Sequence, residues 1–209
     1  MRDTDLLRWA VRFCRARGTS WSLEQVAAVE VQRALAEERE RDPTGVDFGV
    51  FDLSRFGVPQ TRRRLLAGSP HIIAGLRAAA AATPAQRSVY DVIGSACRGT
   101  HVRNATTNTF VQQGGVRVRI PVTETHPSFA RSVSCMAYTV TRTSQLRWWT
   151  PGDEGCKVFS PRELACLQGF PASYELAASQ RLAYEQVGNA IPPPVMELVC
   201  KVAMEAQGC

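Results

Sequence analysis

Three short segments carry most of the residues that could do chemistry. They read Phe56-Gly-Val-Pro-Gln-Thr-Arg-Arg-Arg64, Arg162-Glu-Leu-Ala-Cys-Leu-Gln-Gly-Phe-Pro171 and Gln186-Val-Gly-Asn-Ala-Ile-Pro-Pro193. Side chains alternate along an extended segment, so Gln60, Arg62 and Arg64 are predicted to point to one side. A guanidinium group offers forked donors to phosphate or carbonyl oxygens and stays charged. Three arginines in a row also occur in generic basic patches and targeting signals, but the preceding Phe-Gly-Val-Pro-Gln argues against both.

A second candidate for ligand contact is the basic stretch between Cys97 and Thr150. It contains no lysine and only one acidic residue, Glu124, beside seven arginines at positions 98, 103, 117, 119, 131, 142 and 147. The difference of six equals the net charge of the whole chain, +6. Such a segment favours contact with phosphate groups. A solvated loop region with an arginine bias is the alternative, and charge alone leaves the two about equal.

In this order, the three segments resemble motifs VIII, IX and X of the DNA cytosine-5 methyltransferases. The resemblance covers nearly the whole chain and corresponds to the C-terminal half of that family, motifs VI to X. The basic stretch then falls where the family places its target recognition domain. The resemblance implies that a cytosine is flipped out of the duplex, that a cysteine thiolate attacks its C6, and that S-adenosylmethionine methylates C5.

The resemblance also implies the catalytic residues of this chain. Glu24 in Ser22-Leu-Glu-Gln-Val26 stands where the family has Glu-Asn-Val, and its carboxyl group would hold the N3 and amino edge of cytosine and act as the acid. Gln25 replaces the family's Asn, a departure that leaves the local geometry open. Arg64 would bind cytosine O2 and a nearby phosphate, and Arg62 would order the pocket from behind. Without the later motifs, Glu24 would be interpreted as a surface residue at a strand end.

The remaining site residues also follow from the resemblance. Gly188, Asn189 and Ala190 would lie beside the S-adenosylmethionine site, where Asn189 could equally be a helix cap. Contacts to double-stranded DNA are expected from residues in and before the recognition domain, namely Gln60, Arg117, Arg119, Tyr138, Thr139, Thr141 and Arg142. No metal site is expected. Trp148 and Trp149 are predicted to be core or interface residues more than platforms for stacked bases, and Leu164, Leu167 and Phe170 are predicted to be core.

The periodicity of apolar residues predicts the elements that position these groups. Helices are expected over 3–17, 27–41, 177–186 and 192–206, with a mostly helical stretch over 71–97, and strands over 21–26, 46–53, 64–68, 116–122 and 133–141. Ser160 and Glu163 form a capping box before another helix. The predicted fold class is α/β: a partial Rossmann-like methyltransferase sheet with helices, plus a small, mostly β or irregular target recognition domain.

The predicted domains are residues 1–97, carrying motifs VI to VIII, residues 98–159 as the recognition domain, and residues 160–209, returning to the catalytic domain. The family's first half has no counterpart in the sequence. None of the fifteen glycines lies in a Gly-x-Gly pattern and no cysteine follows a proline. Alone, the strands ending near Val26, Leu53 and Gly68 would leave an unpaired sheet edge.

We therefore expect a companion subunit that carries motifs I to V, including the glycine loop and the Pro-Cys nucleophile. The chain would then be one half of a split DNA cytosine-5 methyltransferase, an enzyme only as part of that complex. The alternative is a catalytically inactive, methyltransferase-derived protein that binds DNA or acts as a scaffold. A tRNA substrate stays open, because one branch of the family methylates tRNA.

The composition of the chain indicates in which cellular compartment the protein is located. No apolar run reaches the roughly 18 residues that a membrane-spanning helix needs, and Arg8 and Arg12 interrupt the apolar N-terminal stretch where a signal peptide would be uncharged. The seven cysteines are irregularly spaced, which argues against a disulfide framework and a structural zinc. Free thiols predict a reducing compartment inside the cell, the cytoplasm or the nucleus.

Overall fold

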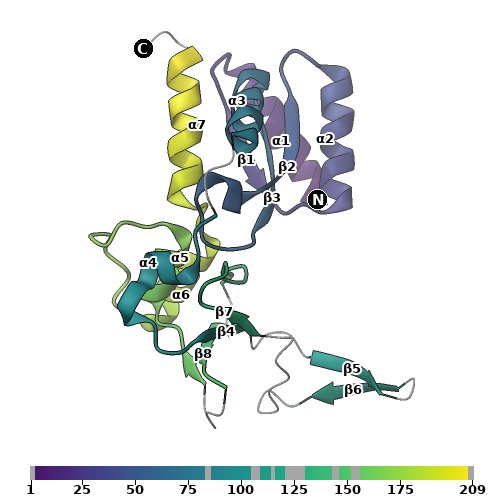
Figure 1. Cartoon of the computed structure of the whole chain (residues 1–209). Coiled ribbons are helices and arrows are strands. Elements are labelled where there is room, and N and C mark those ends of the chain that lie inside the picture. Colours follow the sequence, from purple (N-terminus) through teal and green to yellow (C-terminus); the bar gives the residue numbers. More distant parts are fainter. Residues whose placement is uncertain are drawn as a thin grey trace. The chain divides into compact units, whose positions relative to one another are not determined.

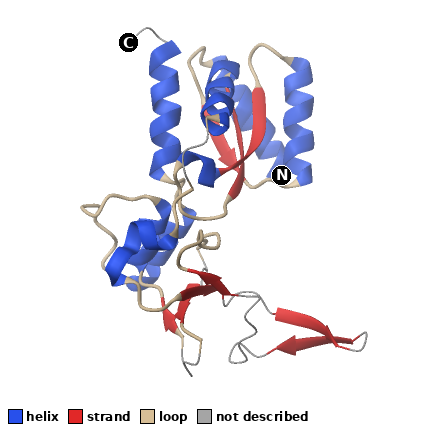
Figure 2. Cartoon of the chain, in the orientation of Figure 1, coloured by secondary structure: helices blue, strands red, loops and turns tan. Residues whose placement is uncertain are grey.

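The computed structural model describes residues 3–82, 86–104, 109–113, 116–120, 130–142, 146–151 and 156–206, and within these ranges it describes the side chains except at residue 3 and over 105–129. The chain forms two compact units, here called unit 1 and unit 2 (Figures 1 and 2). Unit 1 comprises Met1–Gly57, Arg63–Ala85 and Pro193–Cys209, and unit 2 comprises Val58–Arg62 and Gln86–Pro192. Of the segment 160–209 that the sequence assigns to the catalytic domain, only Pro193–Cys209 lies in unit 1.

Unit 1 is built on a three-stranded antiparallel sheet in the order β1-β3-β2. Its elements are α1 (Asp3–Ala16), β1 (Ser22–Gln25), α2 (Val29–Arg41), β2 (Asp47–Asp52), the 3-10 helix η1 (Leu53–Phe56), β3 (Arg63–Gly68), α3 (Pro70–Ala81) and α7 (Pro193–Ala206). Helix α1 packs against α2, and α3 packs against α7. Figure 1 shows these two helix pairs on different sides of the sheet.

The core of unit 1 follows from the amphipathic pattern of its helices. Leu7 and Val11 of α1 are buried in one cluster with Trp21, Leu35 and Leu65. Leu7 and Val11 are four residues apart, which is helical spacing, so one face of α1 covers the sheet.

In the second helix pair of unit 1, α3 approaches α7 closely at Gly75. A β-carbon on Gly75 would lie 2.6 Å from a methyl group of Val202. The missing side chain therefore allows the two helices to pack together.

Unit 2 combines short helices with antiparallel strands. Its elements are α4 (Val89–Ile93), the 3-10 helix η2 (Gly94–Ala96), β4 (His101–Asn104), β5 (Thr109–Gln113), β6 (Val116–Ile120), β7 (Ala130–Ser132), β8 (Leu146–Trp149), β9 (Lys157–Val158), α5 (Pro161–Gln168) and α6 (Gln180–Asn189). Four strands form a sheet in the order β7-β4-β8-β9, and β5 pairs with β6. The described core centres on Trp148, whose ring stacks on Phe159 with centroids 4.0 Å apart. Trp149 is also buried, so the prediction of core tryptophans is confirmed.

Helix α5 begins at the predicted capping box. The Ser160 hydroxyl accepts from the Glu163 backbone N–H, and the Glu163 carboxylate accepts from the Ser160 N–H at 2.6 Å. Glu163 also accepts from Trp148 Nε1 and pairs with Arg98. The Glu163 carboxylate therefore connects the start of α5 to Trp148 in the core and to Arg98 in the segment before β4.

Two sequence-based element assignments are wrong. Residues 133–141 form a turn and an extended loop instead of a strand, with one isolated parallel bridge between Gln60 and Ala137. Helix α6 starts at Gln180 and continues through Gly188 to Asn189 instead of breaking there. The predicted α/β fold class is confirmed. No helix in the described ranges is long and apolar enough to cross a membrane.

Candidate functional site

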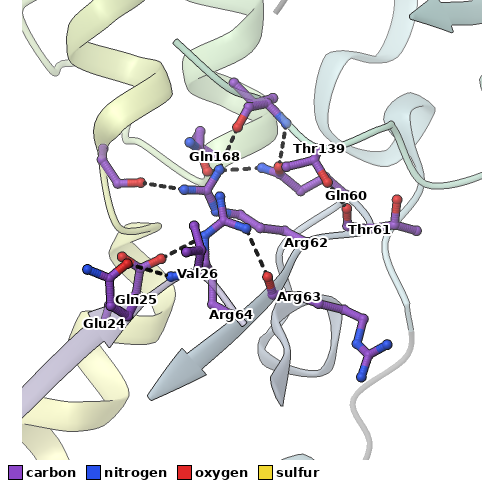
Figure 3. A network of polar contacts seen from close by, with 12 residues as sticks. Glu24, Gln25, Val26, Gln60, Thr61, Arg62, Arg63, Arg64, Thr139 and Gln168 are labelled. Atoms are coloured by element: carbon purple, nitrogen blue, oxygen red, sulfur yellow. Dashed lines mark hydrogen bonds and ion pairs between the residues drawn. The ribbon is translucent and has the colours of Figure 1, made fainter. Parts of the chain in front are cut away.

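In unit 1, Glu24 and Arg64 form an ion pair on the sheet. Glu24 lies opposite Leu66 in the β1–β3 register, so Arg64, two residues away on β3, is its diagonal neighbour on the same face. Arg64 Nε faces Glu24 Oε1 (Figure 3) at a distance of 2.8 Å, and the two side chains are 17% and 18% exposed. The pair is thus held by the sheet and still reaches solvent.

The neighbouring Gln25 does not join this pair. Its side-chain oxygen accepts from the Val26 N–H at 2.8 Å and so folds back onto the backbone. The residue that departs from the family's Asn therefore stabilises the end of β1 and leaves the Glu24 carboxylate to Arg64. A carboxyl group in this position accepts hydrogen bonds when ionised and donates one when protonated.

In unit 2, Gln60 is the centre of a buried polar network. It has no exposed surface. Its amide nitrogen donates to Leu167 O and to Gln168 Oε1, both at 3.0 Å, and its oxygen accepts from Val140 N at 2.7 Å. Gln168 Nε2 in turn donates to Val187 O at 2.8 Å. Gln60 therefore joins the loop around Val140 to the end of α5, and Gln168 extends this connection to α6.

Arg62 holds the other side of the same loop residue. Its Nη1 donates to Val140 O at 2.5 Å and its Nη2 to Ala190 O at 3.4 Å, and the side chain is 3% exposed. The backbone N–H and carbonyl of Val140 are thus both bound by buried side chains, Gln60 and Arg62. The two flanking residues, Thr139 and Thr141, are fixed in place by this arrangement.

Further contacts hold the same loop, here called the 137–142 loop. The Thr139 hydroxyl donates to Thr61 O, and Thr61 N donates to Ala137 O at 3.0 Å. Arg131 donates to Thr61 Oγ1 at 3.0 Å and places its guanidinium 4.1 Å from the centre of the Tyr138 ring. The segment 58–62 and the 137–142 loop therefore form one polar assembly.

Gly188 packs directly against the end of the 137–142 loop. A β-carbon on Gly188 would lie 2.3 Å from Arg142 N and 2.4 Å from Arg142 Cα. Any side chain here would push the loop away from α6. This close approach explains a glycine inside a helix, where it is otherwise unfavourable.

The predicted site residues thus fall into separate groups. Glu24 and Arg64 meet in unit 1, while Gln60, Arg62, Tyr138, Thr139, Thr141, Gly188 and Ala190 lie in or around the polar assembly of unit 2. Arg142 is exposed at the end of the loop. Arg117 and Arg119 lie in β6, and their side chains are outside the described part of the structure.

Of the residues predicted to lie beside the cofactor, Asn189 has the most accessible side chain. It is exposed and lines a shallow depression of about 580 Å³ together with Leu176, Leu182 and Gln186. Gly188 is buried against the loop, and the carbonyl of Ala190 is bound to Arg62. Among the described residues, no cluster of His, Cys, Asp and Glu could hold a metal ion.

Two residues of this assembly, Gln168 and Val140, were not predicted as site residues, and Arg131 was named only as part of the basic stretch. Gln168 lies in the quoted segment between Leu167 and Gly169, and a polar residue within a core-forming run is a signal that could have found it. It is fully buried, and a buried amide needs partners for its donors and its acceptor. Val140 acts only through its backbone, which side-chain patterns do not reveal.

The chain is thus a two-unit α/β protein with an acid–guanidinium pair on the sheet of unit 1 and a loop held by buried polar side chains in unit 2. The family model for C-5 cytosine-specific DNA methylases matches residues 76–205. This is more than half of the chain, so the chain belongs to the C-5 cytosine-specific DNA methylase family. The predicted resemblance is confirmed.

Curated relatives match over shorter stretches. The chain is 42% identical over 55 residues to "Type II methyltransferase M.HpaII" of Haemophilus parainfluenzae, which is 26% of this chain and 15% of that protein. It is 35% identical over 78 residues to "Type II methyltransferase M.AquIB" of a Picosynechococcus strain, or 32% of this chain and 55% of that protein. The match therefore spans a small part of M.HpaII, whereas M.AquIB is itself shorter than this chain.

Two solved structures share the fold. The structure of S. pombe Dnmt2 methyltransferase has a TM-score of 0.55 at 16% identity, covering 90% of this chain and 67% of that one. A putative DNA modification methyltransferase encoded within an E. coli prophage has a TM-score of 0.60 at 13% identity, covering 99% and 75%. A quarter to a third of these chains is therefore not covered by the match.

Proposed function

We propose that this chain is the base-holding and DNA-reading half of a DNA cytosine-5 methyltransferase. A companion chain would supply the S-adenosylmethionine loop and the Pro-Cys nucleophile. The observation that carries this proposal is the Glu24–Arg64 pair, an acid and a guanidinium held 2.8 Å apart on one face of the sheet. Membership of the cytosine-5 family supports the choice of reaction, and the missing glycine loop and Pro-Cys pair motivate the companion.

The proposed role of Glu24 follows from what its carboxyl group can donate and accept. Addition of a thiolate to C6 of cytosine places electron density on the ring, and a proton donated at N3 neutralises it. Glu24, once protonated, can give that proton and can accept a hydrogen bond from the exocyclic amino group. Arg64 can bind the ring oxygen O2, since its guanidinium has further N–H groups beyond the one facing Glu24.

The polar assembly of unit 2 would prepare the DNA-facing loop. Gln60 and Arg62 are too buried to touch a duplex without rearrangement, at 0% and 3% exposure. We assign them to positioning the 137–142 loop, whose Thr139, Thr141 and Arg142 would contact the DNA backbone around the extruded base. A loop fixed in advance binds with a smaller loss of conformational entropy.

S-adenosylmethionine would supply the methyl group when bound. The residues of this chain fit only the margin of such a site: Asn189 offers an exposed amide, whereas Gly188 and Ala190 are engaged with the 137–142 loop and Arg62. This incomplete fit is what the companion chain would complete. We further propose that the enzyme acts on duplex DNA and that it is located in the cytoplasm or the nucleus.

The test is methyl transfer to duplex DNA from radiolabelled S-adenosylmethionine by the assembled complex. Glu24→Gln keeps the shape of the side chain but removes the proton donor, so transfer should fall by at least 100-fold, in the range of general acid catalysis, while duplex affinity stays within twofold. Glu30→Gln, at an exposed position of α2, is the matched control and should remain active. Full activity of Glu24→Gln would refute the catalytic assignment, and duplex binding without transfer by any complex would favour an inactive DNA-binding protein.

A further inference from the structure

Helix α1 exposes three large apolar side chains on one flank. Leu6, Trp9 and Phe13 are 51%, 59% and 44% exposed. Their spacing of three and four residues places them side by side on the helix surface. The rings of Trp9 and Phe13 stack with centroids 5.2 Å apart. This row is here called the α1 stripe.

The other flanks of α1 already have partners. Leu7 and Val11 are buried in the core of unit 1. Three arginines on another flank form ion pairs with α2 and the residue after it, namely Arg8 with Glu37, Arg12 with Glu38 and Arg15 with Asp42. By helical periodicity the α1 stripe faces away from both the core and α2. Arg17 places its guanidinium 4.7 Å from the centre of the Phe13 ring, but the three stripe side chains remain exposed.

Strand β1 has an open edge in the same unit. The order β1-β3-β2 places β1 at the edge of the sheet, and among the described residues β1 pairs with β3 alone. One row of its backbone N–H and carbonyl groups is therefore open to another strand. Val26, directly after β1, is 51% exposed. Exposed strand edges combined with apolar patches are typical of interaction sites.

The extent of the structural matches indicates what could cover this surface. The match to the E. coli prophage methyltransferase covers 99% of this chain. A quarter of that methyltransferase, and a third of S. pombe Dnmt2, lies outside the match. M.AquIB, a methyltransferase shorter than this chain, gives a precedent for chains of this size in the family.

We propose that the α1 stripe and the free edge of β1 together form the docking surface for the companion chain that carries the Pro-Cys nucleophile. The companion would add a strand beside β1 and cover the α1 stripe with apolar side chains. Trp9 and Phe13 would be the anchors, since aromatic residues dominate the affinity of most protein interfaces. This inference rests on the proposed function, because it assigns a surface to the companion that the function requires.

The test uses the full chain and, as the probe, the Pro-Cys-bearing chain that copurifies with it, produced separately. Trp9→Glu and Phe13→Glu place a charge in the stripe and should each raise the Kd of the complex at least tenfold. Met204→Glu is the matched control, because Met204 is similarly exposed on α7 of the same unit at 56%. It should change the Kd by less than twofold. Circular dichroism should show unchanged folding for all three variants, since each replaces an exposed side chain.

A second measurement follows the sheet edge. Hydrogen exchange of the Ser22–Gln25 amides should slow at least tenfold on complex formation in the wild type. If the companion binds but neither variant weakens the complex and these amides are unaffected, the docking surface is wrong while the proposed function stands. If no companion exists, both proposals fall. A dimer of this chain alone that Trp9→Glu dissociates in sedimentation velocity would show that a second copy is the occupant, and would overturn the inference.

Discussion

Replacing Gln60 with leucine should destabilise unit 2 more than any surface substitution. Leucine has about the volume of glutamine, so the change removes hydrogen bonds with little change in packing. Three hydrogen bonds disappear, which leaves Val140 N, Leu167 O and Gln168 Oε1 without this partner. A buried polar group left unsatisfied costs about 1–3 kcal/mol. For the two buried backbone groups, Val140 N and Leu167 O, we expect a loss of about 2–6 kcal/mol in the free energy of unfolding.

This loss is a large part of the roughly 5–15 kcal/mol that holds a typical domain folded. Urea unfolding of the full chain, followed by tryptophan fluorescence and by hydrogen exchange at the Val140 amide, measures it. Gln180→Leu is the control, because Gln180 is exposed at the start of α6, and it should cost less than about 0.5 kcal/mol. Equal stability of the two variants would refute the polar network as the element that fixes the 137–142 loop.

Three further changes test other parts of the structure. Gly188→Ala should lower the free energy of unfolding by about 1–3 kcal/mol through overpacking against Arg142, and urea denaturation that finds it stabilising would contradict the close approach. Ser160→Ala should cost about 1 kcal/mol through loss of the α5 cap, and no loss in the same assay would contradict the capping role. The hydrogen bond from Arg12 lowers the pKa of Glu38, so the pair stabilises the fold above about pH 4.3 and this contribution disappears as the pH falls through the lowered pKa. Glu38→Gln should thus be less stable than the wild type at neutral pH, and this difference should shrink as the pH falls through the lowered pKa of Glu38; a constant difference across a pH series of urea unfolding would contradict this.

The elements that local signals define were predicted well. Helix α1 was expected over 3–17 and runs over Asp3–Ala16, because its apolar spacing is regular. The capping box at Ser160 and the helix starting at the proline run near 193 were also predicted, since proline and serine act on the residues next to them.

The features that could not be predicted from the sequence depend on contacts between residues far apart in the chain. Glu24 and Arg64 were each selected, but only the pairing of β1 with β3 makes them neighbours. Gln60 was expected to face DNA, whereas its amide lies inside unit 2 because the backbone of Val140 and the end of α5 supply its partners. The strand expected over 133–141 is a loop, because side chains and the 58–62 segment supply partners for several of its backbone groups.

The most direct test of the account is native mass spectrometry of the chain isolated under gentle conditions from its own source, combined with a methylation assay on the same sample. We expect a stoichiometric complex with a second chain that contains a glycine-rich loop and a Pro-Cys segment, and transfer of methyl groups to C5 of cytosine in duplex DNA. A free monomer, or a complex with a partner of unrelated sequence that binds DNA but transfers no methyl group, would contradict it.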